Sequence, residues 1–114
     1  MKQFIKIMKA LSDPSRVKIL KMLQRRMMCV CEIQEALGIA QSTASKHLKI
    51  LEDAGLTTFQ KDGLWVNYRL ADGRDSTYAQ TILAHLNEWL EDDPHVTELM
   101  QRLPEIRRET ICRK

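Results

Sequence analysis

The chain has 114 residues, 44% of them apolar, and a formal net charge of +3. That length suits a single domain with one modest core, and such a domain often gains stability by dimerising. No apolar stretch is long enough for a signal peptide or a membrane span, and three cysteines are an odd count for a disulfide framework. We therefore expect a cytoplasmic protein with reduced thiols and no membrane partner.

The charge is unevenly distributed along the chain. Residues 1–26 carry eight Lys or Arg against one acidic residue, whereas residues 75–104 carry one against six. Residues 105–114 return to four basic against two acidic. Clustered basic charge can neutralise phosphates, and an acidic stretch is unsuited to a DNA surface. The basic character therefore belongs to the N-terminal third and the tail.

Apolar residues recur at helical spacing through the first part of the chain. A first helix is predicted over residues 4–11, with its lysines outward. Asp13 and Pro14 then start a second helix, because Asp caps a helix and Pro suits its first turn, and this helix ends at residues 25–26. Its buried stripe is expected at Val17, Ile19, Leu20 and Leu23.

Two further helices follow with a turn between them. The third is predicted from Cys29 to Leu37 with Gly38 as its stop, and the fourth over residues 41–54 with Gly55 as its stop. This spacing and composition are typical of a helix-turn-helix, whose second helix enters the major groove of DNA.

After the fourth helix the apolar pattern alternates. Residues 57–61 and 64–70 are rich in β-forming residues and are joined by Asp62-Gly63, which predicts a hairpin. On it Leu64, Val66, Tyr68 and Leu70 would share one face. Helical spacing returns over 76–90 and 95–103. We expect a mainly α member of the α+β class, with a winged helix-turn-helix domain for DNA binding and dimerisation over 1–103 and a charged tail over 104–114.

Five stretches of the sequence carry a resemblance to a known family. They are residues 10–16, 29–33, 41–48, 54–56 and 62–70. The chain resembles the ArsR/SmtB family of bacterial metal- and metalloid-responsive repressors, closest to the arsenic-responsive type, continuously over 4–70 and more loosely through 103. The resemblance implies a homodimer that binds an inverted-repeat operator in double-stranded DNA, is released by its inducer, and serves arsenic resistance. Its interface would use the first and fifth helices through Phe4, Ile7, Met8, Leu11, Tyr78, Ile82, Leu86 and Trp89.

The fourth helix holds most of the candidate DNA-binding residues. Hydroxyls and lysines near a helix N-terminus reach phosphates and base edges, although helix capping alone also favours Ser and Thr there. The candidates are Gln41, Ser42, Thr43, Ser45, Lys46, His47 and Lys49, together with Lys61 on the wing. No phosphate-binding loop or catalytic triad is present in the sequence, so we do not expect an enzyme.

Cys29 and Cys31 are the candidate metal ligands. Thiolates prefer soft ions, so As(III), Sb(III), Cd(II), Pb(II), Zn(II) and Cu(I) are all eligible. The resemblance to the arsenic-responsive type implies that the inducer is As(III) or Sb(III), with the other ions as alternatives. On a regular helix residues i and i+2 face different ways, so both sulfurs would meet one ion only if the helix start unwinds. The arsenic site of the resembled family often has a third cysteine where this chain has Gln34. Cys112, from the same subunit or from the other one, is therefore the candidate third ligand. The alternative is that two thiolates and an exogenous group hold the ion.

Three alternatives stay open. In a redox sensor the cysteines would themselves be oxidised, although cysteines at positions i and i+2 form a disulfide poorly. The cysteines could also be inert apolar packing residues. A zinc site like the fifth-helix site of the resembled family would use His85, His95 and Glu98, but Leu83 stands in place of its Asp and Pro94 interrupts the helix.

Overall fold

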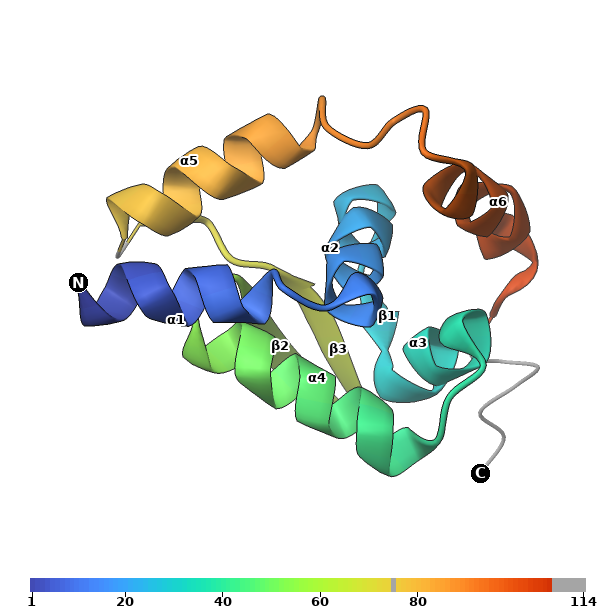
Figure 1. The fold of residues 1–114 in the computed structure, drawn as a ribbon. Coiled ribbons are helices and arrows are strands. Elements are labelled where there is room, and N and C mark those ends of the chain that lie inside the picture. The colour runs from blue at the N-terminus through green and yellow to red at the C-terminus, as the bar shows by residue number, and fades with distance from the viewer. Residues whose placement is uncertain (75, 108–114) are drawn as a thin grey trace.

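Six α-helices and one three-stranded sheet make up the part of the chain that the computed structural model describes, residues 1–74 and 76–107 (Figure 1). The helices are α1 (Lys2–Ala10), α2 (Pro14–Arg25), α3 (Val30–Leu37), α4 (Gln41–Asp53), α5 (Thr77–Leu86) and α6 (Pro94–Arg102). The strands are β1 (Met28–Cys29), β2 (Thr57–Asp62) and β3 (Trp65–Leu70), and a 3-10 turn, η1, spans Leu103–Glu105. The winged helix-turn-helix prediction is confirmed. None of the described helices is long and apolar enough to cross a membrane.

The predicted start of α2 is also confirmed. The Asp13 carboxylate accepts hydrogen bonds from the backbone N–H groups of Ser15, at 2.8 Å, and Arg16, at 3.2 Å, and Pro14 occupies the first turn. At the end of α3, Gly38 adopts φ +67°, a left-handed conformation that glycine reaches without strain. These two local signals fix where α2 begins and where the turn of the helix-turn-helix lies.

The wing turn lies one residue later than expected. Asp62 pairs with Trp65, so the two-residue loop is Gly63-Leu64, with Gly63 at φ +63°. A positive φ at the first loop position alone suits a type II′ turn, which matches the twist of the strands. Leu64 is therefore not a strand residue packed on one face, but lies at the tip and is 83% exposed.

Strand β1 is a second departure from the prediction. Met28 and Cys29 pair antiparallel with Tyr68 and Asn67 of β3, giving the sheet order β1-β3-β2. The sequence placed Cys29 inside the third helix, because two residues are too short to show a strand period. In the structure Cys29 is an extended residue that joins the helix-turn-helix to the wing.

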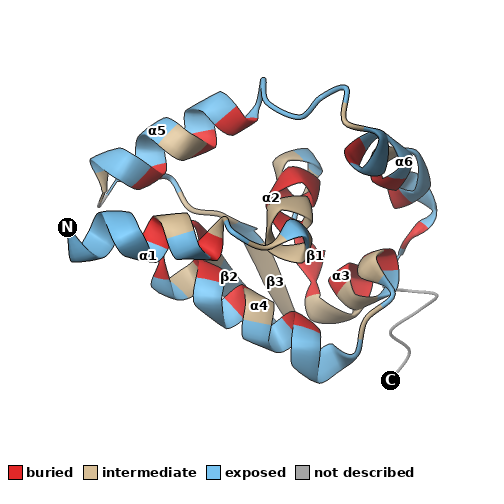
Figure 2. Ribbon diagram, viewed as in Figure 1, coloured by how far each residue is buried: buried red, intermediate tan, exposed pale blue. Residues whose placement is uncertain are grey.

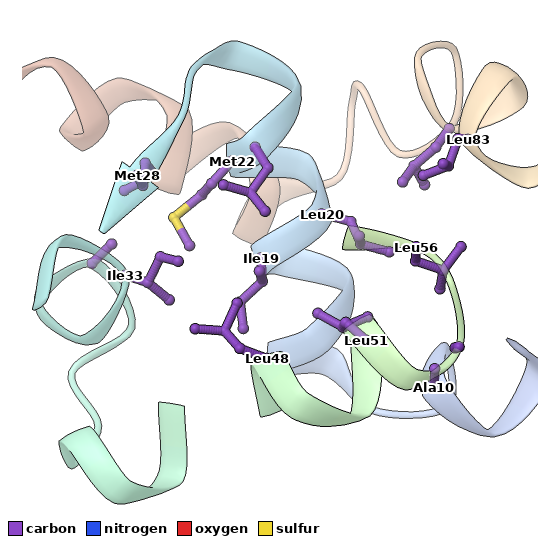
Figure 3. Close-up of a cluster of buried hydrophobic side chains, with 14 of the residues drawn as sticks. Ala10, Ile19, Leu20, Met22, Met28, Ile33, Leu48, Leu51, Leu56 and Leu83 are labelled. Atoms are coloured by element: carbon purple, nitrogen blue, oxygen red, sulfur yellow. The ribbon is translucent and has the colours of Figure 1, made fainter. Parts of the chain in front are cut away.

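Helix α2 lies at the centre of the core. Ile19, Leu20 and Met22 have no exposed surface, and α2 is surrounded by the other elements (Figure 2). Figure 3 shows these side chains with their apolar neighbours from the other elements, among them Ile33, Leu48, Leu51 and Leu56. Val17, expected in the buried stripe, is only half-buried.

Lys21 of α2 is almost fully buried, with 1% of its surface exposed. Its ammonium donates to the carbonyls of Leu86, at 2.8 Å, and Trp89, at 2.9 Å, and pairs with the Glu91 carboxylate. These contacts satisfy carbonyls at and beyond the end of α5, which stops at Leu86 rather than continuing to residue 90 as expected.

Replacing Lys21 with Met should lower the free energy of unfolding by about 2 kcal/mol, because it leaves its buried acceptors unpaired. Lys21 lowers the pKa of Glu91, first through their hydrogen bond and then through its charge. The contribution of this ion pair is therefore lost as the pH falls below the ordinary glutamate range, about 4.3, and the deficit of the variant should shrink there.

The measurement is urea unfolding at fixed protein concentration, with Lys6→Met on the exposed face of α1 as the control. The control should change stability by no more than about 0.5 kcal/mol. Equal effects of the two substitutions would contradict the structural role of Lys21.

Candidate DNA interface and cysteine site

Helix α4 turns a polar face to solvent. Ala44, Leu48 and Leu51 are fully buried, so the opposite face points outward (Figure 2). Most of the sequence-predicted DNA-binding residues lie on that face and are exposed, namely Gln41, Ser42, Thr43, Ser45 and Lys46. The structure thus brings hydroxyl, amide and ammonium groups together at one end of one helix.

The N-terminus of α4 has no side-chain cap. The N-cap residue is Ala40, at φ −70° and ψ 153°, so Ser42 and Thr43 lie within the helix and capping does not account for them. The first N–H groups of an uncapped helix carry partial positive charge and suit a phosphate oxygen. This arrangement favours DNA contact over the capping explanation.

His47 is half-buried and contacts Arg16 of α2. The Arg16 guanidinium lies 3.2 Å from His47 Nδ1 and also donates to the carbonyls of Ala10, at 2.8 Å, and Lys9, at 3.1 Å. Arginine only donates, so His47 Nδ1 is the acceptor in this contact. Arg16 therefore links the end of α1 to the middle of α4 and sets the orientation of His47.

The remaining candidate lysines differ in their surroundings. Lys49 forms an exposed ion pair with Asp53, 3.4 Å away and one turn along α4, whereas Lys61 lies on β2, opposite Val66, and is exposed. A phosphate contact by Lys49 would have to compete with Asp53.

The two cysteine sulfurs lie 3.1 Å apart. Cys29 is the N-cap of α3, at φ −85° and ψ 167°, and only Cys31 belongs to the helix. The i, i+2 geometry of a helix does not apply, because the first of the two residues is extended. The expected placement of Cys29 inside the helix is therefore wrong, and the start of α3 already has the distortion expected for both sulfurs to meet one ion.

Glu32 holds Cys29 in this conformation. Its carboxylate accepts the Cys29 backbone N–H at 2.9 Å, and the Cys29 sulfur accepts the Glu32 N–H, which together form a capping box. Burial raises the pKa of the Cys29 thiol; the hydrogen bond from the Glu32 N–H opposes this, and the Glu32 charge adds to it. The Cys29 thiol thus keeps its proton at neutral pH.

The zinc alternative gains no support. No group of three or more His, Cys, Asp or Glu side chains able to hold a metal ion occurs within residues 1–74 and 76–107. His85 lies on α5, where Nδ1 is 2.8 Å from the Thr81 carbonyl, whereas His95 and Glu98 belong to α6, a separate helix (Figure 1). Cys112, the candidate third ligand, lies outside the described residues.

Comparison with known proteins agrees with this arrangement. Residues 13–58 match the family described as bacterial regulatory protein, arsR family. The chain is 34% identical to a cadmium resistance regulatory protein CadC homolog of Staphylococcus aureus, over 73% of this chain and 69% of that one. It is 45% identical to an arsenical resistance operon repressor of Bacillus subtilis, over 56% and 62%. Other relatives, among them SmtB repressors, are spanned over less than two thirds of their length.

A solved structure matches the fold over most of the chain. It is the homodimeric winged helix-turn-helix DNA-binding domain Mb0332 from Mycobacterium bovis, described as a possible ArsR-family regulator. The TM-score is 0.65 at 29% identity, covering 85% of this chain and 84% of that one.

A winged helix-turn-helix with an exposed polar recognition helix defines a DNA-binding transcriptional regulator. The chain belongs to the ArsR/SmtB family of such regulators and is not an enzyme. The family prediction is confirmed, but cadmium and arsenical relatives both match, so the comparisons favour no subtype.

Two residues that shape the site, Arg16 and Glu32, have no role that the sequence alone assigns. The Glu three residues after a helix N-cap is a known capping-box signal and could have been recognised. The contact between Arg16 and His47 leaves no local signal, because the two residues are far apart in the chain.

If Lys46 contacts a phosphate, Lys46→Ala should weaken binding to operator and random DNA alike. The slope of log K against log salt should flatten by about 0.9 per subunit, or about twice that in a dimer. Lys49→Ala should have a smaller effect, because Asp53 already pairs with that lysine.

Fluorescence anisotropy across a salt series checks this prediction. Lys2→Ala, an exposed lysine on α1, serves as the control and should leave the slope unchanged. A slope equally flattened in Lys2→Ala and Lys46→Ala would contradict the assignment of α4.

Proposed function

We propose that this regulator is a repressor that leaves its operator when trivalent arsenic or antimony binds Cys29 and Cys31. The observation that carries the proposal is the 3.1 Å separation of the two sulfurs beside the recognition motif. Two sulfurs this close can bond one thiophilic ion, and soft ions select thiolate ligands. The match to arsenical resistance repressors supports the same chemistry.

The binding step with arsenous acid is a condensation. Two As–S bonds form, two As–OH bonds break, and the two thiol protons leave with the hydroxyl groups as water, so arsenic stays trivalent. Cys112, or an exogenous group such as the remaining hydroxyl, would complete the coordination. Cd(II), Pb(II), Zn(II) or Cu(I) are the alternatives at the same sulfurs, and oxidation of the cysteines is the redox alternative.

Release of DNA would follow from the two elements that Cys29 joins. Cys29 pairs with Asn67 in the wing strand β3 and also caps α3, the first helix of the helix-turn-helix. A shift of Cys29 when its sulfur binds an ion would therefore disturb two elements at once, the wing through β3 and the helix α3 that precedes α4 in the helix-turn-helix. The operator would be an inverted repeat in double-stranded DNA, because each subunit offers one recognition helix.

The proposed homodimer uses α1 and α5. Phe4 and Tyr78 are 41% and 48% exposed, and their rings meet edge to face with centroids 5.5 Å apart. Ile7 and Leu86, which the sequence also assigned to this interface, are buried within the protomer. The interface would therefore be built on the exposed aromatic pair.

Either Cys29→Ser or Cys31→Ser should abolish DNA release by arsenite while leaving operator affinity within about twofold, because a hydroxyl is a poor ligand for a soft ion. Cys112→Ser, at the candidate third ligand, should have a smaller effect. Titration of reduced protein on labelled operator measures both quantities. Release of DNA from both serine variants at wild-type arsenite concentrations would refute the sensor site.

The pH dependence should separate the ions. Because the Cys29 thiol has a raised pKa and stays protonated, Cd(II) must displace at least one proton, so its apparent affinity should rise at least about tenfold per pH unit from about pH 6 to 8. Arsenous acid carries the hydroxyls that take up the protons, so its affinity should stay nearly constant. Calorimetry over this range checks both trends, and a steep pH dependence for arsenite would contradict the condensation.

Tyr78→Glu should yield monomers that no longer bind the operator, because it places a charge at the centre of the proposed interface. The matched control is Phe59→Glu, since Phe59 is 43% exposed but lies on the wing. Sedimentation velocity measures the oligomeric state. A Tyr78→Glu protein that remains dimeric at micromolar concentration would place the interface elsewhere.

A further inference from the structure

A single guanidinium connects the cysteine site to the C-terminal segment Leu103–Ile106. Nη1 of Arg26 donates to Glu32 Oε2 at 2.9 Å, and Nη2 donates to the carbonyls of Leu103, at 3.3 Å, and Ile106, at 2.6 Å. The other oxygen of Glu32 accepts the Cys29 N–H. Three hydrogen bonds, through one guanidinium and one carboxylate, therefore join residue 106 to residue 29.

This connection is largely buried. The side chain of Glu32 is 5% exposed and that of Arg26 is 37% exposed, and Leu103 and Ile106 are 4% and 7% exposed. Removing one partner from such a pair leaves a buried charge or carbonyl without its hydrogen bond, which is costly. A lysine cannot replace the planar fork that serves a carboxylate and two carbonyls at once. The segment and the carboxylate therefore hold one another in place.

The other end of α3 is attached to the same part of the chain. Nη2 of Arg102, the last residue of α6, donates to the Ala36 carbonyl at 2.9 Å. Figure 1 shows the chain descending from α6 to lie beside α3. Residues 102–106 are thus attached near both ends of α3, directly at Ala36 and through Arg26 at Glu32.

We infer that the segment Leu103–Ile106 helps to hold the cysteine site in its binding conformation, with Arg26 and Glu32 as positioning residues. While the segment is docked, Glu32 is held against the Cys29 N–H, and the extended conformation of Cys29 keeps its sulfur beside that of Cys31. Releasing the segment frees Glu32 and loosens the pair of sulfurs. The docking of the C-terminal segment therefore sets the affinity of the site for its inducer. The nature of that inducer rests on the proposed function.

The first arm of the test measures arsenite affinity of the reduced, full-length protein. Arg26→Gln and Glu32→Gln should each weaken it by about tenfold or more, as loss of residues that orient metal ligands does. Arg26→Lys keeps the positive charge beside Glu32, so its arsenite affinity should lie between that of Arg26→Gln and that of the wild type. Arg25→Gln is the matched control, with the same charge change at the neighbouring exposed position. Operator affinity without arsenite should stay within about twofold in the Arg25→Gln control.

The second arm measures amide hydrogen exchange without arsenite. Glu32→Gln should speed exchange in residues 103–107 although the substitution is distant in sequence, and Arg26→Lys should do so less. Unchanged exchange there, or equal arsenite affinities of Arg26→Lys, Arg26→Gln and Arg25→Gln, would overturn the inference. Failure of the wild-type protein to bind arsenite would instead refute the proposed inducer, and the exchange arm would show separately whether the coupling exists.

Discussion

The hydrogen bond from the Cys29 backbone to the Glu32 carboxylate holds Cys29 extended at the start of α3. Three consequences depend on that conformation. Cys29 can pair with β3, its sulfur lies 3.1 Å from the sulfur of Cys31, and α3 begins at Val30 rather than at Cys29. If Cys29 were helical, the sulfurs would diverge and the wing would lose its third strand. The link between a ligand site and the DNA-binding elements thus depends on one capping interaction.

The DNA-binding surface is supported in a similar way by distant side chains. Arg16 ties the end of α1 to His47 of α4, and Lys21 holds the end of α5 against the central helix. Both cations bond backbone carbonyls rather than relying on exposed ion pairs, which contribute little. The recognition helix and the proposed dimer helices are therefore both fixed to α2.

Most of the fold could be predicted from local signals. Asp13-Pro14 starts α2, Gly38 ends α3, and the alternation after residue 56 predicts the wing, because each depends on residues close together in the chain. The short strand β1, the early end of α5 at Leu86 and the bonds of Arg26 depend on partners far along the sequence, and no period or motif reports them. At the candidate site, the sequence identified the pair of cysteines but placed Cys29 inside the helix, because a strand of two residues shows no period.

The central claim is that the cysteine pair is coupled to the wing through the pairing of β1 with β3. Hydrogen exchange at the β3 amide that faces β1, which is one of the consecutive amides of Asn67 and Tyr68, tests it most directly, in the reduced protein with and without arsenite, and in Cys29→Ser. We predict that arsenite speeds exchange at this amide in the wild type and leaves it unchanged in the variant. Release of the operator by arsenite with unaltered exchange in β3 would contradict the account.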